Sequence, residues 1–190
     1  LVPPLMKEAV SRIAAPAIRN TGTMAGNIGN GSAKADSVLI EFAADAKLVL
    51  SGTGGRRIVE ITDFYKGRKQ LDLRNDELIT EILLPKKGLE NYMYKKVGAR
   101  KALAISRVSF AGIIQMDGER IGHIAVAFGA VESTVVRHKE LEKMLDEYGQ
   151  NEEELKDVIS RSVHQLVPKH ITREDILASI NYNMHLEYGM

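Results

Sequence analysis

The sequence predicts an α+β protein made of two consecutive domains. Short apolar runs rich in β-branched residues alternate with turn signals between residues 47 and 128, and helix-like stretches follow them. A polar, turn-rich tetrapeptide at residues 85–88 (PKKG) interrupts this pattern and is the predicted domain boundary. We therefore expect one domain over residues 1–87 and a second domain, an antiparallel sheet with helices, over residues 88–190.

Two helices are expected in the first half. The first spans residues 4–14, and Pro16 is predicted to end it because proline cannot continue a helix. The second spans residues 37–44, an apolar run that follows a stretch rich in glycine and asparagine.

Three strands are also expected there, at residues 47–51, 57–61 and 78–84. The sequence GTGG at residues 52–55 predicts a hairpin turn between the first two. Residues 62–65 (TDFY) predict a capped helical turn.

The second half begins with a predicted strand at residues 91–97. Asp117-Gly118 predicts a tight hairpin between strands at residues 106–116 and 121–128. Three helices follow, and they are expected to start near Arg137, Asn151 and Thr172.

Composition excludes several classes of protein. The mean hydropathy of −0.15 and the lack of a long apolar run argue against a membrane protein, and the net charge of +1 gives no reason to expect a nucleic-acid partner. There is no cysteine, so the chain has no disulfide, thiolate metal ligand or iron–sulfur ligand, which fits a cytoplasmic protein. The chain starts with Leu1 and runs at once into helix-like sequence, so we expect it to be part of a longer polypeptide.

No catalytic motif is visible in the sequence. The HExxH, Walker and GxSxG patterns are absent, and the five histidines are scattered, so we predict no metal site and assign no catalytic residue. If the chain belongs to an enzyme, a bound cofactor is expected to carry the chemistry.

The most informative segment is residues 19–36, RNTGTMAGNIGNGSAKAD. Glycine lets a ligand approach the bare backbone, and the start of a helix presents unpaired N–H groups. The segment is therefore a candidate phosphate cradle, with Thr23 and Asn27 as polar side chains and Asp36 closing it. A solvent-exposed connection, with Asp36 as a helix N-cap, is the alternative reading.

This segment resembles the second flavin-binding motif, IRNxGTxGGNxxxxSPxAD, of the FAD subunits and domains of molybdenum hydroxylases. The chain has alanine at positions 25 and 33, where the motif has glycine and proline, and Ala25 then requires a negative φ or mild strain. Further resemblances are the strand ELITEI (residues 77–82), the segment YKKVGARKALAIS (residues 94–106) and the strand IAVAFGAV (residues 124–131). The resemblance covers nearly the whole chain and weakens only after about residue 170.

The resemblance implies a second subdomain of a vanillyl-alcohol-oxidase-type FAD-binding domain, followed by a C-terminal domain of the carbon monoxide dehydrogenase flavoprotein type. It implies an FAD-binding electron-transfer subunit, with molybdopterin and [2Fe-2S] clusters on a large and a small partner subunit, and NAD as a possible acceptor. The implied cofactor contacts are Thr23, Gly26 and Asn27 at the phosphates, Asn30 and Ala35 along the same loop, Asp36 at the adenosine ribose, Ile79 against a ring system, and Lys96 (or Lys95) at the flavin. The family's earlier AGGTD-like loop does not occur here, so the chain alone is expected to bind FAD weakly or not at all.

Two other functions remain open on the sequence. The chain could be a non-catalytic interaction module that keeps the fold without the cofactor, which Ala25 and Ala33 favour and Thr23, Asn27 and Asp36 oppose. It could also be a nucleotide-binding domain unrelated to flavin, which would bind ATP or NAD without FAD.

Overall fold

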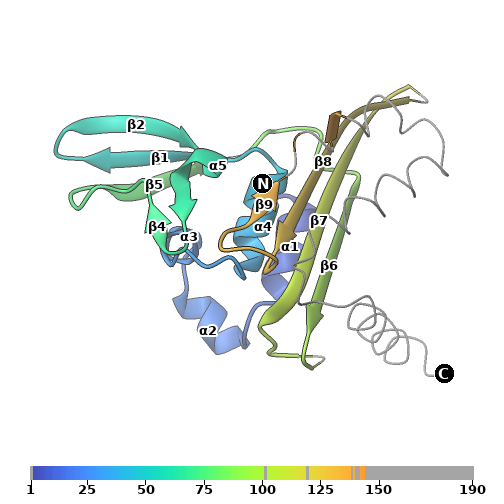
Figure 1. Cartoon of the computed structure of the whole chain (residues 1–190), viewed down its shortest axis with the longest axis horizontal. Helices are drawn as coiled ribbons and strands as arrows, with labels where there is room; N and C mark the ends of the chain where they lie inside the picture. The colour runs from blue at the N-terminus through green and yellow to red at the C-terminus, as the bar shows by residue number, and fades with distance from the viewer. Residues whose placement is uncertain (1, 101, 119, 138, 140–141, 144–190) are drawn as a thin grey trace.

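The structure is a computed structural model that describes residues 2–100, 102–118, 120–137, 139 and 142–143 (Figure 1). The predicted helices that start near Asn151 and Thr172 lie outside the described residues, as does most of the one expected from Arg137. Val136 and Arg137 form a short strand paired with Ala127 and Phe128, so this helix starts later than predicted, and the described residues Lys139, Glu142 and Lys143 are helical.

Four helices occupy the first part of the chain. They are α1 (Pro4–Ser11), α2 (Pro16–Thr21), α3 (Met24–Gly29) and α4 (Asp36–Ala43). The predictions of α1 and α4 are confirmed, but α1 stops earlier than expected. Pro16 was predicted to end a helix and instead begins α2, at a position where its missing N–H is not needed.

A three-stranded antiparallel sheet follows, in the order β2-β1-β5. Its strands are β1 (Lys47–Gly52), β2 (Gly55–Glu60) and β5 (Leu78–Leu83), so both the predicted hairpin and the third strand are confirmed. The predicted helical turn is α5 (Ile61–Phe64), but no side chain caps it. Two short strands that the sequence did not reveal, β3 (Tyr65–Gly67) and β4 (Gln70–Leu71), pair with each other.

The second sheet has four strands in the order β6-β7-β8-β9. They are β6 (Tyr92–Gly98), β7 (Ser106–Asp117), β8 (Arg120–Gly129) and β9 (Val136–Arg137). The long β7–β8 hairpin confirms the turn predicted at Asp117-Gly118, and Gly118 has the positive φ of 62° that such a turn uses.

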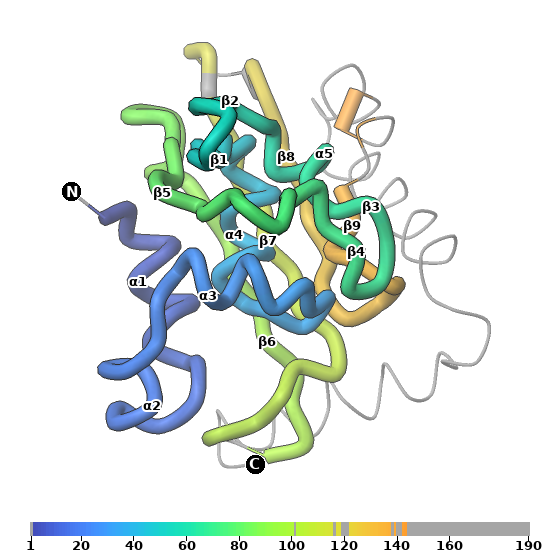
Figure 2. The backbone as a smooth tube through the Cα atoms, turned by 90° about the vertical axis from the view of Figure 1, so that its left-hand side faces the viewer, coloured from blue at the N-terminus to red at the C-terminus, as the bar shows by residue number. Residues whose placement is uncertain are grey.

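Helix α4 lies at the centre of the molecule. Figure 1 shows it between the two sheets, and Figure 2 shows it behind α3. Every residue of α4 is buried, and the helix packs against α1 on one side and β7 and β8 on another. Because of this packing, one hydrophobic core includes Leu39 and Leu48 from the first half together with Ala111 and Ala127 from the second.

Candidate functional site

The glycine- and asparagine-rich segment is partly helical. We expected an open loop over residues 19–36, but α2 extends to Thr21 and α3 covers Met24–Gly29. Thr23 is the N-cap of α3, and its Oγ1 accepts a hydrogen bond from the N–H of Gly26 (2.9 Å). Ala25 lies inside this helix with a negative φ, so the alanine causes no backbone strain.

Distant residues hold α3 in place from several sides. Its Asn27 Nδ2 donates to Oγ of Ser37 in α4 (2.7 Å), and Tyr65 Oη donates to the carbonyl of Ile28 (2.9 Å). At the end of the helix, Lys69 Nζ donates to both the carbonyl (2.9 Å) and the side-chain Oδ1 (3.0 Å) of Asn30. These bonds fix the segment before any ligand is present.

The turn after α3 depends on one glycine. Gly31 has φ of 62°, and a Cβ at this position would lie 3.2 Å from the Cα of Lys69. Farther along, the N–H of Ala130 donates to the carbonyl of Ala33 (2.8 Å), which attaches the segment to the end of β8. The segment from Thr23 to Asp36 thus contacts both sheets.

Asp36 is the first residue of α4 and is buried, with only 4% of its surface exposed. Its Oδ2 accepts a hydrogen bond from Lys96 Nζ and its Oδ1 accepts one from Ser106 Oγ, both at 2.7 Å. The alternative reading of Asp36 as the N-cap is wrong, because Ala35 occupies that position. A sugar hydroxyl would have to share or displace these two donors to reach the carboxylate.

Lys96 is the lysine of β6 that points toward the helices. Besides its ion pair with Asp36, its Nζ donates to the carbonyl of Arg12 at the end of α1 (3.0 Å). The ammonium therefore lies between the C-terminal end of α1 and the N-terminal end of α4, where the two helix dipoles favour a cation and an anion respectively. Lys95 is exposed on the other face of β6, as strand alternation requires.

Two of the predicted cofactor contacts are thus brought together in an unexpected way. Sequence reasoning gave Asp36 and Lys96 separate roles at the ribose and at the flavin, whereas the structure pairs them at 2.7 Å. Ser106 received no role, although it ends the segment YKKVGARKALAIS. Ser106 lies 70 positions after Asp36 in the sequence, so no local sequence pattern predicts their contact and only the fold reveals it.

Tyr94 lies next to this pair, on the same side of β6. Burial raises the pKa of its hydroxyl, and the nearby negative charge of Asp36 raises it further. The guanidinium of Arg12 lies over its ring, 5.6 Å from the centroid. A neutral, buried phenol therefore closes one side of the Asp36–Lys96 pair.

The start of α3 is one of the exposed parts of the segment. Thr23 and Gly26 are exposed, and the hydroxyl proton of Thr23 is free to donate because the oxygen already accepts from Gly26. A Cβ at Gly26 would lie 2.8 Å from Thr23 Oγ1, so the position requires a bare backbone. An exposed hydroxyl beside a bare glycine backbone suits an anionic ligand such as a phosphate, so the residues present here fit that part of FAD.

Ile79 lies on β5, opposite Leu50 of β1, and packs partly buried against the main core. Ala35 is also buried. Neither side chain has a polar group. Both residues lie near α3, because α3 packs against β5, which contains Ile79, and against α4, which Ala35 precedes.

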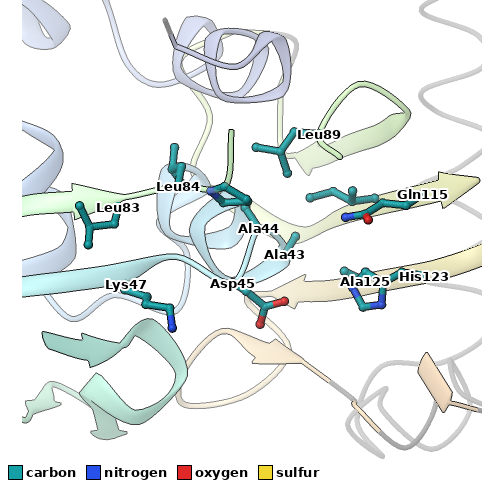
Figure 3. Close-up of a pocket in the computed structure, with 12 residues that line it drawn as sticks. Ala43, Ala44, Asp45, Lys47, Leu83, Leu84, Leu89, Gln115, His123 and Ala125 are labelled. Carbon is teal, nitrogen blue, oxygen red and sulfur yellow. The ribbon is translucent and has the colours of Figure 1, made fainter. Parts of the chain in front are cut away.

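A cavity of about 800 Å³ adjoins the start of α3. Its walls are mainly apolar, with Met6 and Val10 from α1, Met24 from α3 and Ile82 from β5, and Lys7 and Arg19 supply the positive charge. A second cavity, of about 480 Å³, opens where the end of α4 meets β5, β7 and β8. Figure 3 shows Leu84 and Leu89 at the top of this second cavity and Asp45 and Lys47 at the bottom.

Glu41 is the other acidic residue of α4. It is fully buried (0% exposed), and neither of its carboxylate oxygens has a hydrogen-bond partner among the described residues. Burial raises its pKa from 4.5 to about 8. The sequence gave no warning of this group, because a single acid within an apolar helix resembles a solvent-facing residue.

Within the described part of the chain, no three His, Cys, Asp or Glu side chains lie close enough together to hold a metal ion. In the same residues, no helix has the length and apolar character needed to span a bilayer.

Comparison with known proteins places this geometry in a family. The family described as "FAD binding domain in molybdopterin dehydrogenase" matches residues 2–87, and "CO dehydrogenase flavoprotein C-terminal domain" matches residues 92–187. The chain is 33% identical over 165 residues to the glyceraldehyde dehydrogenase medium chain of Sulfolobus acidocaldarius, covering 87% of this chain and 58% of that protein. It is 32% identical over 185 residues to the xanthine dehydrogenase FAD-binding subunit of Escherichia coli O157:H7, covering 96% of this chain and 62% of that protein.

The fold gives the same relationship. The structure superimposes on carbon monoxide dehydrogenase from Hydrogenophaga pseudoflava with a TM-score of 0.80 and 28% identity, covering 88% of this chain and 58% of that chain. The described fold is therefore the mixed sheet-and-helix fold that the resemblance implied. From its two matching family regions, its relatives and its fold, the chain belongs to the FAD-binding medium subunits of the molybdenum hydroxylases, which are oxidoreductase components.

Proposed function

We propose that this chain is the part of a molybdenum hydroxylase that holds FAD and passes electrons from iron–sulfur clusters to it, and onward to NAD or another acceptor. The proposal includes a large molybdopterin-binding subunit and a small iron–sulfur subunit as partners, and a cytoplasmic location. The absence of cysteine from the chain agrees with iron–sulfur clusters carried by a partner. FAD, when bound, supplies the redox chemistry, and the residues of this chain bind and orient it.

The observation that carries the proposal is the start of α3. Thr23 and Gly26 are exposed there. The rest of the helix is fixed by hydrogen bonds to other elements: Asn27 bonds to Ser37, Ile28 to Tyr65, and Asn30 to Lys69. A cradle that is rigid before binding loses little conformational entropy when the ligand arrives. This arrangement suits the phosphates of a dinucleotide.

The roles of individual residues remain proposals. We assign Thr23, Gly26 and Asn27 to the phosphates, Asn30 and Ala35 to the lining of the same segment, and Ile79 to an apolar contact with a ring system. Asp36 and Lys96 remain candidates for the ribose and the flavin. Their mutual ion pair supports a contribution through positioning, since a ligand would have to compete for both groups.

The division of labour within the chain is also a proposal. Residues 1–87 would contribute the cofactor segment, and residues 88–190 would contribute the sheet that supports it. The main core crosses this boundary, so we expect the two parts to depend on each other for stability.

A pair of matched glycine variants tests the proposal. In Gly26→Ala the new Cβ must displace Thr23 Oγ1, whereas in Gly29→Ala, in the same helix, the Cβ meets nothing within 4 Å. Titration of the full chain with FAD, followed by flavin fluorescence, should give a dissociation constant about tenfold weaker for Gly26→Ala, a loss comparable to that of an N-cap bond. Gly29→Ala should bind as the unmodified chain does.

Two results would contradict the proposed function. One is saturable binding of ATP or NAD without FAD, which a nucleotide-binding domain unrelated to flavin would give. The other is a holoenzyme that contains this chain and holds no FAD, as expected of a non-catalytic interaction module. The unstrained conformation of Ala25 removes one of the two sequence arguments for that module.

A further inference from the structure

Asp36, Lys96 and Ser106, together with the carbonyl of Arg12, form a group that we call the Asp36 clamp. Four elements meet in it: the end of α1, the start of α4, and strands β6 and β7. Each oxygen of the carboxylate accepts one bond of 2.7 Å, and the ammonium also donates to the carbonyl at 3.0 Å. The clamp joins residues from both family regions of the chain.

The clamp is buried but electrically balanced. The side chain of Lys96 is 9% exposed, and Asp36 and Ser106 are 4% and 1% exposed. Burying one charge without a partner is costly, so a carboxylate and an ammonium in this position depend on each other. Ser106 completes the arrangement by satisfying the oxygen that Lys96 does not reach.

A short series of contacts leads from the clamp to the cofactor segment. Asp36 is followed by Ser37, whose Oγ accepts the bond from Asn27 Nδ2 in α3. A shift of the first turn of α4 therefore moves the partner of Asn27, and with it the start of α3 where Thr23 and Gly26 are exposed. The clamp fixes that first turn from the side of the second sheet.

We propose that Ser106 and Lys96 are positioning residues, which order the segment from Thr23 to Asp36 by holding Asp36. This inference rests on the proposed FAD site for its functional meaning, but the ordering itself exists without FAD. Neither residue needs to touch the cofactor to affect its binding. The second sheet thereby takes part in cofactor binding through β6 and β7.

The strand β7 offers a matched control. Ser109 lies on the same strand as Ser106 and is equally buried, at 2% exposed, but its Oγ has no hydrogen-bond partner among the described residues. Ser106→Ala and Ser109→Ala therefore remove the same atom from similar surroundings. Only the first variant removes a bond to a carboxylate.

The experiment measures amide hydrogen exchange in the full chain without FAD. Ser106→Ala should raise the exchange of residues 24–39 about tenfold and leave residues 47–60 of the β1–β2 hairpin unchanged, since a hydrogen bond to a charged group is lost at one place only. Ser109→Ala should change neither region. Asp36→Asn, which keeps the shape of the side chain, should repeat the pattern of Ser106→Ala.

FAD titration of the same variants separates this inference from the proposed function. We expect Ser106→Ala to bind FAD about tenfold more weakly and Ser109→Ala to bind it normally. Equal exchange of residues 24–39 in the two serine variants would overturn the clamp inference. Faster exchange in Ser106→Ala, together with a holoenzyme that holds no FAD, would support the clamp and overturn only the proposed function.

Discussion

Two positions in α4 treat a buried carboxylate in opposite ways. At the first residue, Asp36 receives a bond on each oxygen, while Glu41, farther along the same helix, has no partner among the described residues. Both side chains are almost completely buried. The difference teaches that position decides whether a buried acid finds partners: a helix start next to β6 and β7 meets a lysine and a serine, and a helix middle within an apolar core meets neither.

Glu41 accordingly keeps its proton at neutral pH, with a pKa raised to about 8 by burial. Tyr65 responds to the same surroundings, because burial and the charge of Glu41 both raise the pKa of its hydroxyl. The protein therefore contains a group that prefers one protonation state when folded and the other when unfolded.

The largest expected effect concerns Glu41 and pH. Its folded pKa of about 8 exceeds the ordinary value of 4.5, so its stabilisation is complete below pH 4.5 and is lost as pH rises to about 8. At about 1.4 kcal/mol per pH unit, the free energy of unfolding should fall by up to about 5 kcal/mol over this interval. Urea unfolding at several pH values measures this slope.

Glu41→Gln should remove that slope and make the protein more stable than the unmodified chain at pH 8. Glu81→Gln is the control, because Glu81 is half exposed on β5 and forms only an outer ion pair with Arg56. A slope that persists in Glu41→Gln would show that the acid is not protonated in the folded protein, and the contrast with Asp36 would disappear.

The second effect concerns the start of α4, where Asp36 lies. Lys96→Met should lower the free energy of unfolding by about 3 kcal/mol, since it leaves the buried charge of Asp36 without its cation. Combining it with Asp36→Asn should recover at least about 1 kcal/mol, which a double-mutant cycle measures.

An exposed ion pair provides the comparison for this variant. Lys47 and Glu60 pair at 2.7 Å across β1 and β2, with about half of each side chain exposed. Lys47→Met should cost less than about 1 kcal/mol. Equal costs for Lys47→Met and Lys96→Met would contradict the importance assigned to burial.

The smallest effect is expected at Glu77, an acid just before β5 whose side chain is only 5% exposed. Arg57 donates to both oxygens of Glu77 (2.7 and 2.9 Å), and these bonds, with one from the N–H of Arg74, lower the pKa of Glu77 from 4.5 to about 2. A lowered pKa stabilises the folded protein above pH 4.5, and this contribution is lost as pH falls from 4.5 to about 2.

Arg57→Gln should therefore move the midpoint of acid unfolding to higher pH, measured by circular dichroism. Its neighbour Arg56 is exposed and pairs with Glu81, so Arg56→Gln should leave the midpoint almost unchanged. Identical midpoints for the two variants would rule out a special role for the Arg57–Glu77 pair.

The parts of the fold that the sequence predicted well are those with strong local signals. The β1–β2 and β7–β8 hairpins have glycine-containing turns between apolar strands, and α4 is a largely apolar run. Helix α3 was missed because its six residues include two glycines, which disfavour a helix. Its stability comes instead from Tyr65, Ser37 and Lys69, which are remote in the chain.

The candidate site was predictable in part for the same reason. The motif singles out Thr23, Gly26 and Asp36, and the family match covers the residues of that motif, while the roles of these three residues stay predictions. The pairing of Asp36 with Lys96 and Ser106 was not predictable, because it joins residues about 60 to 70 positions apart, whose proximity depends on how the second sheet packs against α4.

The shared core around α4 also limits how this chain can be rebuilt. A replacement for everything after residue 88 must supply more than a compatible sheet: it must present small residues such as Ala111 and Ala127 to α4, a lysine to Asp36 and a serine beside it. Chimaeras that exchange the second half between relatives should therefore fold only when these contacts are exchanged as a set. We therefore expect the two family regions to be exchangeable between relatives only together.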